Sequence, residues 1–298
     1  MTGELFSEIP GSYFFKKIQR IKGTTPVEEV YHVERKTGFP LLLTLTPLKE
    51  YDRKKAEFSS LKRLYSHGIP MPRPEEFGIC KNRERIYFLN EEIEGAPSTQ
   101  IIRSLTTERQ YHMGYNAGQI LAKIHQLSPP TSFDWKEYFE QLVEDTLLAY
   151  KKCSAVLKQE KILLSMVKKT PPGLENRPIR ILHGDFQPEN FLITSHQTIA
   201  VTGFCHQIGD PWCDFCTLPL SYNLSIPFAA GQIDGYFAGK AIPKDFFEIT
   251  SFYLAADALS SFCWACKQEE AEQNAVQNNI DMLCEWYQNF ETTVPNWY

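Results

Sequence analysis

The sequence predicts an α+β fold with two lobes, a small sheet-rich lobe over residues 1–92 and a larger helical lobe over residues 93–298. The 298 residues are enough for two ordinary domains or one large domain. Short runs rich in β-branched and aromatic residues, separated by turn sequences, dominate the first ninety residues. Apolar residues at helical spacing dominate most of the rest, which predicts a mainly helical second lobe.

Five segments of the first lobe carry regular patterns. The turn Gly23-Thr24-Thr25-Pro26 separates the first two strands, and Lys36-Thr37-Gly38 leads into a short apolar strand. Apolar residues within 58–65 recur at helical spacing, and Gly68-Ile69-Pro70 ends that helix. In chain order the prediction is strands over 14–22, 27–35 and 39–46, a helix over 52–67 and a strand over 85–92.

The second lobe begins after the break Gly95-Ala96-Pro97. Residues 106–127 place apolar side chains on one helical face, and residues 133–169 carry a second helical pattern that is interrupted. After the loop Pro171-Pro172-Gly173, short strands are predicted over 179–182, 191–194 and 198–204, and the pattern from residue 245 to the end is helical.

The overall composition is typical of a soluble globular chain. It is 43% hydrophobic and 22% charged, with a formal net charge of -5, which argues against a disordered, collagen-like or coiled-coil chain. No run approaches the roughly 18 to 20 apolar residues of a membrane span, and the first eight residues lack the basic and apolar regions of a signal peptide. We therefore expect a cytoplasmic protein without a membrane partner.

The eight cysteines are expected to be structural free thiols. Cys213/Cys216 and Cys263/Cys266 form C-x-x-C pairs, but the pairs lie much further apart than the roughly 15–20 residues of a zinc-ribbon spacer. A reducing compartment also disfavours disulfides. In the aromatic-rich run SFCWAC, buried thiols are expected to act as small apolar side chains.

Charge is distributed unevenly along the chain. Residues 219–298 contain ten acids and three bases, whereas the preceding part contains 28 bases and 26 acids. An acidic C-terminal part disfavours nucleic acid as a partner and suits a cationic small molecule or peptide. The alternative, which we expect for the clustered Glu269, Glu270 and Glu272, is that the acids coat an outward helix face. The sequence leaves the oligomeric state open.

Residues 181–215 carry the groups with catalytic potential. His183-Gly184-Asp185 follows a predicted strand, Asn190 comes five residues after Asp185, and Gly209-Asp210-Pro211 and Asp214 follow a hairpin. A carboxylate and an amide at this spacing on a loop are suited to orienting a hydroxyl and holding a metal-bound phosphate. An isolated pair of this kind more often caps turns, so its interpretation depends on the rest of the chain.

At these residues the chain resembles the aminoglycoside phosphotransferase and choline kinase family, relatives of the protein kinases that phosphorylate small molecules. The segments HGDFQPEN and GDPWCDF match both ends of the family's catalytic pattern. The likeness covers nearly the whole chain and includes the segments KKAEFSSL, GIPMPRP, EEIEG and QILAKIHQL. It implies a protein-kinase-like fold with a cleft between the two lobes, and ATP and Mg²⁺ as cofactors.

The resemblance implies a role for each residue of the catalytic segment. Asp185 matches the residue that accepts or orients the proton of the substrate hydroxyl, and Asn190 matches a metal-binding asparagine. His183 is expected to hold the loop through hydrogen bonds. Asp210 and Asp214 are expected to brace the loop by binding backbone amides.

The resemblance also implies a nucleotide site in the first lobe. It assigns nucleotide contacts to the loop residues Gly23, Thr24 and Thr25, the strand residue Thr44, the helix residue Glu57 and the hinge residues Glu91 and Ile93. The family has a lysine or arginine at the position of Thr44, so the expected cation is missing. Lys22 and Lys49 are nearby alternatives, although a lone lysine is more often a solvated surface charge.

A second departure concerns the metal. The strand after the catalytic hairpin should end in a metal-binding aspartate, and the matching position here is Thr202, or Gly203 if one residue is deleted. Neither residue has a carboxylate. Each lost electrostatic contact is expected to cost on the order of 10²–10³ in rate.

Two functions remain open from the sequence. The first is an ATP- and Mg²⁺-dependent phosphotransferase acting on a hydroxyl of a small cationic molecule, with Asp257, in the apolar run YLAADALSSF, as an acceptor-binding residue. The second is a catalytically silent kinase-like protein that binds a ligand or a partner protein through the same cleft. Asp185 and Asn190 favour the first function, and the two missing charges favour the second.

Overall fold

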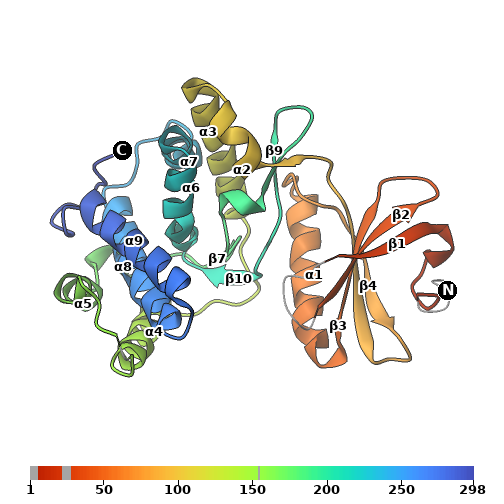
Figure 1. The fold of residues 1–298 in the computed structure, drawn as a ribbon, viewed down its shortest axis with the longest axis horizontal. Coiled ribbons are helices and arrows are strands. Elements are labelled where there is room, and N and C mark those ends of the chain that lie inside the picture. Colours follow the sequence, from red (N-terminus) through yellow and green to blue (C-terminus); the bar gives the residue numbers. More distant parts are fainter. Residues whose placement is uncertain (1–5, 22–27, 154) are drawn as a thin grey trace. The chain divides into compact units, whose positions relative to one another are not determined.

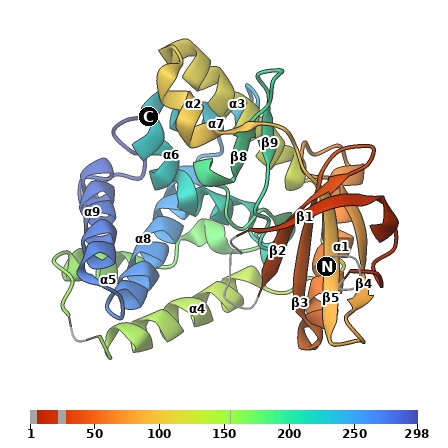
Figure 2. The same cartoon turned by 45° about the vertical axis from the view of Figure 1, so that its right-hand side comes forward.

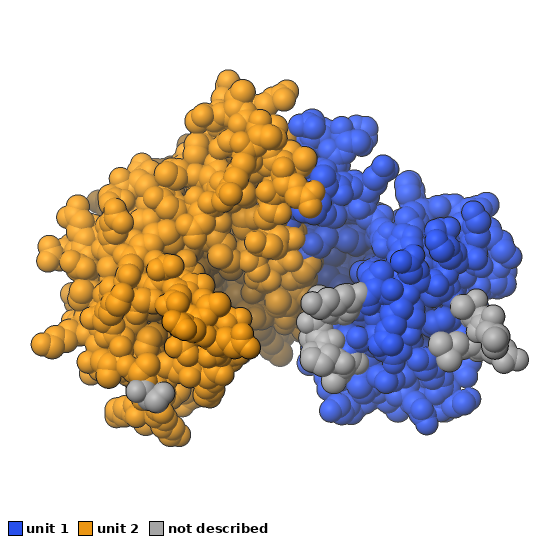
Figure 3. Space-filling model, in the orientation of Figure 1, with its two compact units in different colours: residues 1–97, 191–202 blue, residues 98–190, 203–298 orange. Residues whose placement is uncertain are grey.

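The chain forms two compact units, drawn in separate colours in Figure 3. The computed structural model describes residues 6–21, 28–153 and 155–298. The first unit contains residues 1–97 and 191–202, and the second contains residues 98–190 and 203–298. The expected α+β architecture, an antiparallel sheet in the N-terminal region and helices in the C-terminal region, is confirmed (Figure 1).

An antiparallel five-stranded sheet with the strand order β1-β2-β3-β5-β4 dominates the first unit (Figure 2). The helix α1 (Tyr51–Ser66) packs on one face, where the Phe58 ring stacks against Phe77 and meets Phe88 edge-on. Residues of β3 alternate between the two faces, and Leu41, Leu43 and Leu45 are buried on the opposite face. The strands are β1 (Phe15–Ile21), β2 (Glu29–Arg35), β3 (Leu41–Pro47), β4 (Pro74–Cys80) and β5 (Arg85–Glu91).

Three short strands complete the first unit. They form a second sheet of β6 (Ala96–Pro97), β8 (Phe191–Ile193) and β9 (Ile199–Val201). The hairpin of β8 and β9 was expected in the helical lobe over residues 93–298, but it is part of the sheet-rich unit. The backbone N–H of Val201 donates to the carbonyl of Pro70, which joins the hairpin to the segment after α1.

The second unit is mainly helical. Its closest helix pair is α3 (Thr107–Ile124) and α7 (Ile226–Phe237), where the backbones approach so closely that a Cβ at Gly114 or Gly235 would overlap the facing helix. The other α-helices are α2 (Ser98–Ile101), α4 (Trp135–Tyr150), α5 (Glu160–Val167), α6 (Leu218–Leu224), α8 (Phe246–Ala265) and α9 (Glu270–Trp286). Among the described residues, no helix has the length and apolar character needed to cross a membrane.

The loops that carry Asp185 and Asp210 lie beside short elements of the second unit. The strands β7 (Arg180–Leu182) and β10 (Gln207–Gly209) pair antiparallel, and the 3-10 helices η5 (Pro188–Asn190) and η6 (Pro211–Thr217) follow the two loops. The remaining 3-10 helices are η1 (Ser12–Phe14), η2 (Leu48–Glu50), η3 (Ile102–Ser104) and η4 (Pro172–Leu174).

Several elements were not predicted from sequence. The strand β4 begins at Pro74, which cannot donate to a ladder and which is tolerated here because β4 lies at the edge of the sheet. The strand β10 is only three residues long, and α6 and α7 each carry a proline in the first turn. Their local patterns were too short or too interrupted to predict a strand or helix.

Candidate functional site

The loop that follows β7 is held by the buried carboxylate of Asp214. One carboxylate oxygen accepts the backbone N–H of His183, and the other accepts that of Gly184, both at 2.8 Å. Gly184 has a φ of +83°, and a Cβ there would crowd Cys205, so the turn requires glycine. Asp214 thus makes the amide contacts that a loop-bracing residue needs.

Two histidines complete this support. His125 lies 2.8 Å from Asp214 through Nε2, and its Nδ1 lies 3.0 Å from the Tyr236 hydroxyl. Burial tends to raise the pKa of Asp214, but the contact with His125 and the loop amides keep it below the ordinary value. His183 is fully buried, and its Nδ1 accepts the backbone N–H of Asp185, which fits the expected role of holding the loop.

Asp185 projects from this loop with both carboxylate oxygens hydrogen-bonded. Gln187 donates to Oδ1 and Asn190 donates to Oδ2, each at 2.7 Å. The Asn190 amide also donates to the backbone carbonyl of Asp185 at 2.8 Å. The predicted base and the predicted metal ligand are therefore in direct contact, and Gln187 fixes the carboxylate from the other side.

Asp210 is the centre of a second buried network. Its carboxylate accepts two hydrogen bonds from Arg177, at 2.6 and 2.9 Å, and one from the backbone N–H of Trp212 at 3.0 Å. The Tyr253 hydroxyl donates to the same carboxylate at 2.6 Å, and Trp135 donates to that hydroxyl at 2.6 Å. Asp210 thus anchors two aromatic side chains from α4 and α8.

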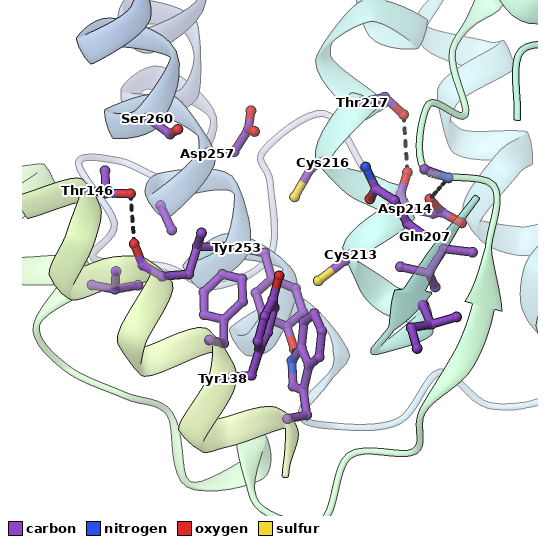
Figure 4. Close-up of a pocket in the computed structure, with 18 of the residues that line it drawn as sticks. Tyr138, Thr146, Gln207, Cys213, Asp214, Cys216, Thr217, Tyr253, Asp257 and Ser260 are labelled. Atoms are coloured by element: carbon purple, nitrogen blue, oxygen red, sulfur yellow. Dashed lines mark hydrogen bonds between the residues drawn. The ribbon is translucent and has the colours of Figure 1, made fainter. Parts of the chain in front are cut away.

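A cavity of about 770 Å³ opens beside Asp185 within the second unit (Figure 4). It is lined by α4, β10, η6 and α8, and Figure 4 shows Asp257 and Ser260 on α8 and Cys216 on η6. The volume is in the range of cavities that bind small molecules. Its walls include the aromatic side chains Trp135 and Tyr253 that the Asp210 network holds.

Asp257 shares this cavity with Asp185. Among the residues that the structure describes, no base and no hydrogen-bond donor is paired with its carboxylate. Although the carboxylate is open to the cavity, the surrounding protein atoms partly desolvate it and raise its pKa to about 6. Asp257 therefore presents a carboxylate to the cavity that is ionised at neutral pH and lacks a partner.

The residues around Asn190 do not fit a protein-held Mg²⁺ of the expected kind. A Cβ at Gly203, which has a φ of +73°, would overlap the Asn190 side chain, so Gly203 is the backbone position that faces the predicted metal ligand. Glycine supplies no carboxylate there. Among the described residues, no three Asp, Glu, His or Cys side chains come together in a way that could hold a metal ion.

The described residues of the first unit offer little of the expected nucleotide chemistry. Thr44 lies on β3 opposite Val30 and Phe88, on the face covered by α1. Glu57 is paired at 3.1 Å with Lys54 of its own helix, and Lys54 is also 3.1 Å from Glu28. The helix carboxylate is thus neutralised locally rather than by a strand cation.

The other residues expected at the nucleotide lie in different settings. Lys49 is an exposed residue of η2, whereas Lys22, Gly23, Thr24 and Thr25 lie outside the described residues. Glu91 accepts hydrogen bonds from Arg35 and Arg73 at 2.8 and 2.9 Å. Burial opposes ionisation of Glu91, but the two guanidinium groups lower its pKa. Ile93 is half-buried just after β5.

Several residues of the site were missed by the sequence analysis. Gln187 lies inside the quoted catalytic segment, where an amide two residues after Asp185 was a usable signal. Arg177, Trp135 and Tyr253 gave no local signal, because each acts through a partner far away in the sequence. Their positions follow only from the folded chain.

The braced loop and the α+β fold agree with the class of protein that the sequence resembles. Residues 19–246 match the phosphotransferase enzyme family designated APH, so the chain belongs to that family. This confirms the resemblance found in the sequence. No protein with a curated function matches the chain.

Solved structures support the same fold. A choline/ethanolamine kinase family protein from Mesorhizobium loti is 15% identical, with a TM-score of 0.66 over 96% of this chain and 94% of that chain. The amicoumacin kinase hAmiN is 12% identical, with a TM-score of 0.64 over 99% and 98%. The macrolide 2'-phosphotransferase MphH from Brachybacterium faecium is 16% identical, with a TM-score of 0.61 over 89% and 92%.

Proposed function

We propose that this protein transfers a phosphoryl group from ATP to a hydroxyl of a small cationic molecule, with Asp185 as the base. The observation that carries the proposal is that Asp185 and Asp257 line one cavity. The first carboxylate is oriented by a braced loop, and the second has no partner among the described residues. Membership of the phosphotransferase family supplies the reaction class.

Asp185 is suited to a base because its orientation is fixed without using up its acceptor capacity. Gln187 and Asn190 each donate to one oxygen, and an ionised carboxylate oxygen can accept a further hydrogen bond. A substrate hydroxyl in the cavity would donate to Asp185 and pass its proton to the carboxylate as the hydroxyl oxygen bonds to the γ-phosphorus of ATP. The bond from that phosphorus to the oxygen of the β-phosphate breaks in the same transfer, and ADP leaves. Positioning supplies most of the catalysis in such reactions.

Asp257 supports a cationic acceptor. A protonated amine would provide the charge that this carboxylate lacks, at a partly desolvated place where an ion pair is stronger than in bulk water. Tyr138 lines the same cavity and is half exposed, so its ring can attract a cation. A neutral acceptor would leave the carboxylate unpaired.

The donor half of the proposal rests on family membership, and its residues are incomplete. ATP is the expected donor, but the residues around Asn190 do not fit a protein-held Mg²⁺, so no step here depends on a metal ligated by the chain. We expect ATP to bind weakly and to gain little from Mg²⁺, because the link from protein to metal to phosphate lacks a carboxylate.

A second candidate is a catalytically silent protein that binds its ligand in the same cavity. Gly203 favours this function, because a position that faces Asn190 carries no carboxylate. Thr44 favours it as well, because Glu57 is paired with Lys54 instead of a strand cation. The silent protein would bind amines through Asp257 without transferring phosphate.

A transfer assay separates the two functions. The chain is incubated with ATP, Mg²⁺ and a panel of amino alcohols, and acceptor-dependent ADP formation is measured beside amine binding. Phosphorylated product supports the enzyme, whereas amine binding without product supports the silent protein. A thermal-shift titration tests the donor side, since ligand at about 100 times its Kd stabilises a fold by about 2.7 kcal/mol. A large Mg²⁺-dependent shift at micromolar ATP would contradict the expected weak donor site.

A further inference from the structure

The carboxylates that line the 770 Å³ cavity leave a single partner for a positive charge on a ligand. Of the described residues that line it, three are acidic. Asp214 is taken up by His125 and two backbone amides, and Asp185 is the proposed base. Asp257 remains as the single carboxylate for a ligand cation. A molecule with several amines would leave the others without partners.

The α4 wall of the same cavity is apolar and open. Phe133, which precedes α4, and Tyr138 and Leu142 of α4 line the cavity, and 37%, 51% and 46% of their surface is exposed. Tyr138 and Leu142 are four residues apart on α4 and therefore lie on one helix face. Adjacent exposed apolar side chains around a cavity are typical of a surface that a ligand covers.

A second cavity of about 180 Å³ adjoins the first at Asp257. Cys216, Thr217 and Asp257 line both cavities. The rest of the second cavity is mainly apolar and is formed by α6, α8 and α9, with Leu254, Ala258, Val276, Ile280 and Leu283 among its lining residues. A substituent on an amine held at Asp257 therefore has an apolar space next to it.

We propose that the acceptor is an amphiphilic amino alcohol, with one positive charge at Asp257 and an apolar arm that occupies the second cavity. This inference rests on the proposed function, because it places the acceptor hydroxyl at Asp185. It narrows the substrate class to molecules with one cationic centre and excludes polycations. The apolar arm gains affinity from the area that Leu254, Ile280 and Leu283 remove from water.

A chain-length series tests the inference. Binding of N-methyl-, N-propyl-, N-butyl- and N-hexylethanolamine is measured by calorimetry, together with alkanols of equal length and the polyamine spermidine. Each methylene that enters the second cavity should tighten binding about fourfold, the equivalent of about 0.8 kcal/mol per buried methylene. Equal affinity along the series, equal binding of the alkanols, or tighter binding of spermidine would overturn the inference.

Two neighbouring serines of α8 provide matched variants. Ser261 lines the second cavity and Ser260 lines the first, so Ser261→Phe and Ser260→Phe place the same ring on different sides. Ser261→Phe should remove the chain-length gain and leave N-methylethanolamine affinity unchanged, whereas Ser260→Phe should weaken the whole series. If affinity still rises with chain length in both variants, the placement of the arm in the second cavity is wrong.

The outcomes keep this inference separate from the proposed function. Amines that bind without any chain-length effect leave the cationic acceptor intact and remove the apolar arm. A chain-length effect without phosphorylated product keeps the arm and removes the transfer reaction. If Ser261→Phe does not fold, the chain-length series on the native chain still decides the inference.

Discussion

The second unit contains the groups that would act on an acceptor, whereas in the described part of the first unit the strand position expected to carry a nucleotide-binding cation is a threonine. Asp185 is oriented by two amides, and the loop that carries it is braced by Asp214. In the first unit, Thr44 stands where the family has a cation, and Glu57 is paired within its own helix. The two halves of a phosphotransferase therefore need separate tests.

The difference also shows which matching residues are informative about function. Asp210 and Asp214 are buried and hydrogen-bonded into the core, so a silent protein would need them as much as an enzyme does. Asp257 is different, because it is exposed at the cavity and no described residue is paired with its carboxylate. An unpaired carboxylate at a cavity is a candidate for contact with a ligand, so this residue is more informative about function.

The largest effect is expected for Asp185→Asn. The substitution keeps the shape of the side chain and removes the base, so turnover of an identified acceptor should fall by about 10²–10⁴. Amine affinity and nucleotide affinity should change little, because the carboxylate acts on the reacting hydroxyl. Steady-state kinetics and calorimetry on the same preparation measure both quantities.

A matched control is Asp52→Asn, which changes an exposed aspartate of α1. It should leave turnover and binding unchanged. Full activity in Asp185→Asn would remove Asp185 from the mechanism and with it the functional contrast between the two units.

The next largest effect is a loss of stability in the variant Arg177→Met. The methionine roughly fills the volume but leaves the buried Asp210 carboxylate without its guanidinium partner. Breaking a buried pair in this way costs about 3–5 kcal/mol in the free energy of unfolding. Denaturant unfolding of the variant measures the loss.

Arg180→Met is the control for this prediction, since within the described chain Arg180 donates to the Ile179 carbonyl and the Ser128 hydroxyl and to no buried carboxylate. It should cost about 1 kcal/mol or less. An equal loss in the two variants would show that Asp210 is not the anchor of the aromatic wall.

The elements that could be predicted from the sequence are those with a strong local pattern. The residues around Phe58 carry a helical period, and the strand from Leu41 is a short apolar run of the length of a buried strand. The segment around His183 indicated the loop that carries Asp185. The resemblance also correctly indicated the family.

The rest depended on contacts between residues far apart in the chain. Arg177 reaches Asp210 across 33 residues, and Trp135 reaches Tyr253 across 118, so neither pair has a local signature. Counting along the sequence left Thr202 and Gly203 as alternatives for the metal position. A side chain at position 203 would point at Asn190, which favours Gly203 as the matching position.

A smaller, pH-dependent effect is expected for Asp257→Asn. The pKa of this carboxyl is raised from 3.8 to about 6 in the folded chain, so ionisation above pH 6 disfavours the folded state, while below 3.8 both states are protonated. The asparagine variant should therefore be more stable than the native chain above pH 6, and the difference should shrink as the pH falls from 6 toward 4. Thermal unfolding across this range measures it.

Amine binding should favour the ionised form of Asp257, whereas folding favours the protonated form. An amine needs the ionised carboxylate, so its affinity for the native chain should rise as the pH increases through about 6 and should be lower and flat in Asp257→Asn. Unchanged amine affinity in the variant would end the cationic-acceptor proposal. A stability gain that persists at pH 4 would show that desolvation is not the cause of the raised pKa.

The smallest effect is expected for charge reversal at Glu270 and Glu272. Both lie exposed in the first turn of α9, where a negative charge interacts favourably with the helix dipole. Glu270→Lys with Glu272→Lys should therefore lower the free energy of unfolding by about 0.3–1 kcal/mol per residue, an effect that salt screens. Amine affinity should stay within about twofold of the native value at physiological salt, because neither residue lines the two cavities and salt screens exposed charges. A tenfold loss of amine affinity, measured by calorimetry at two salt concentrations, would show that the acidic C-terminal part attracts the acceptor as a whole, and that Asp257 does not act alone.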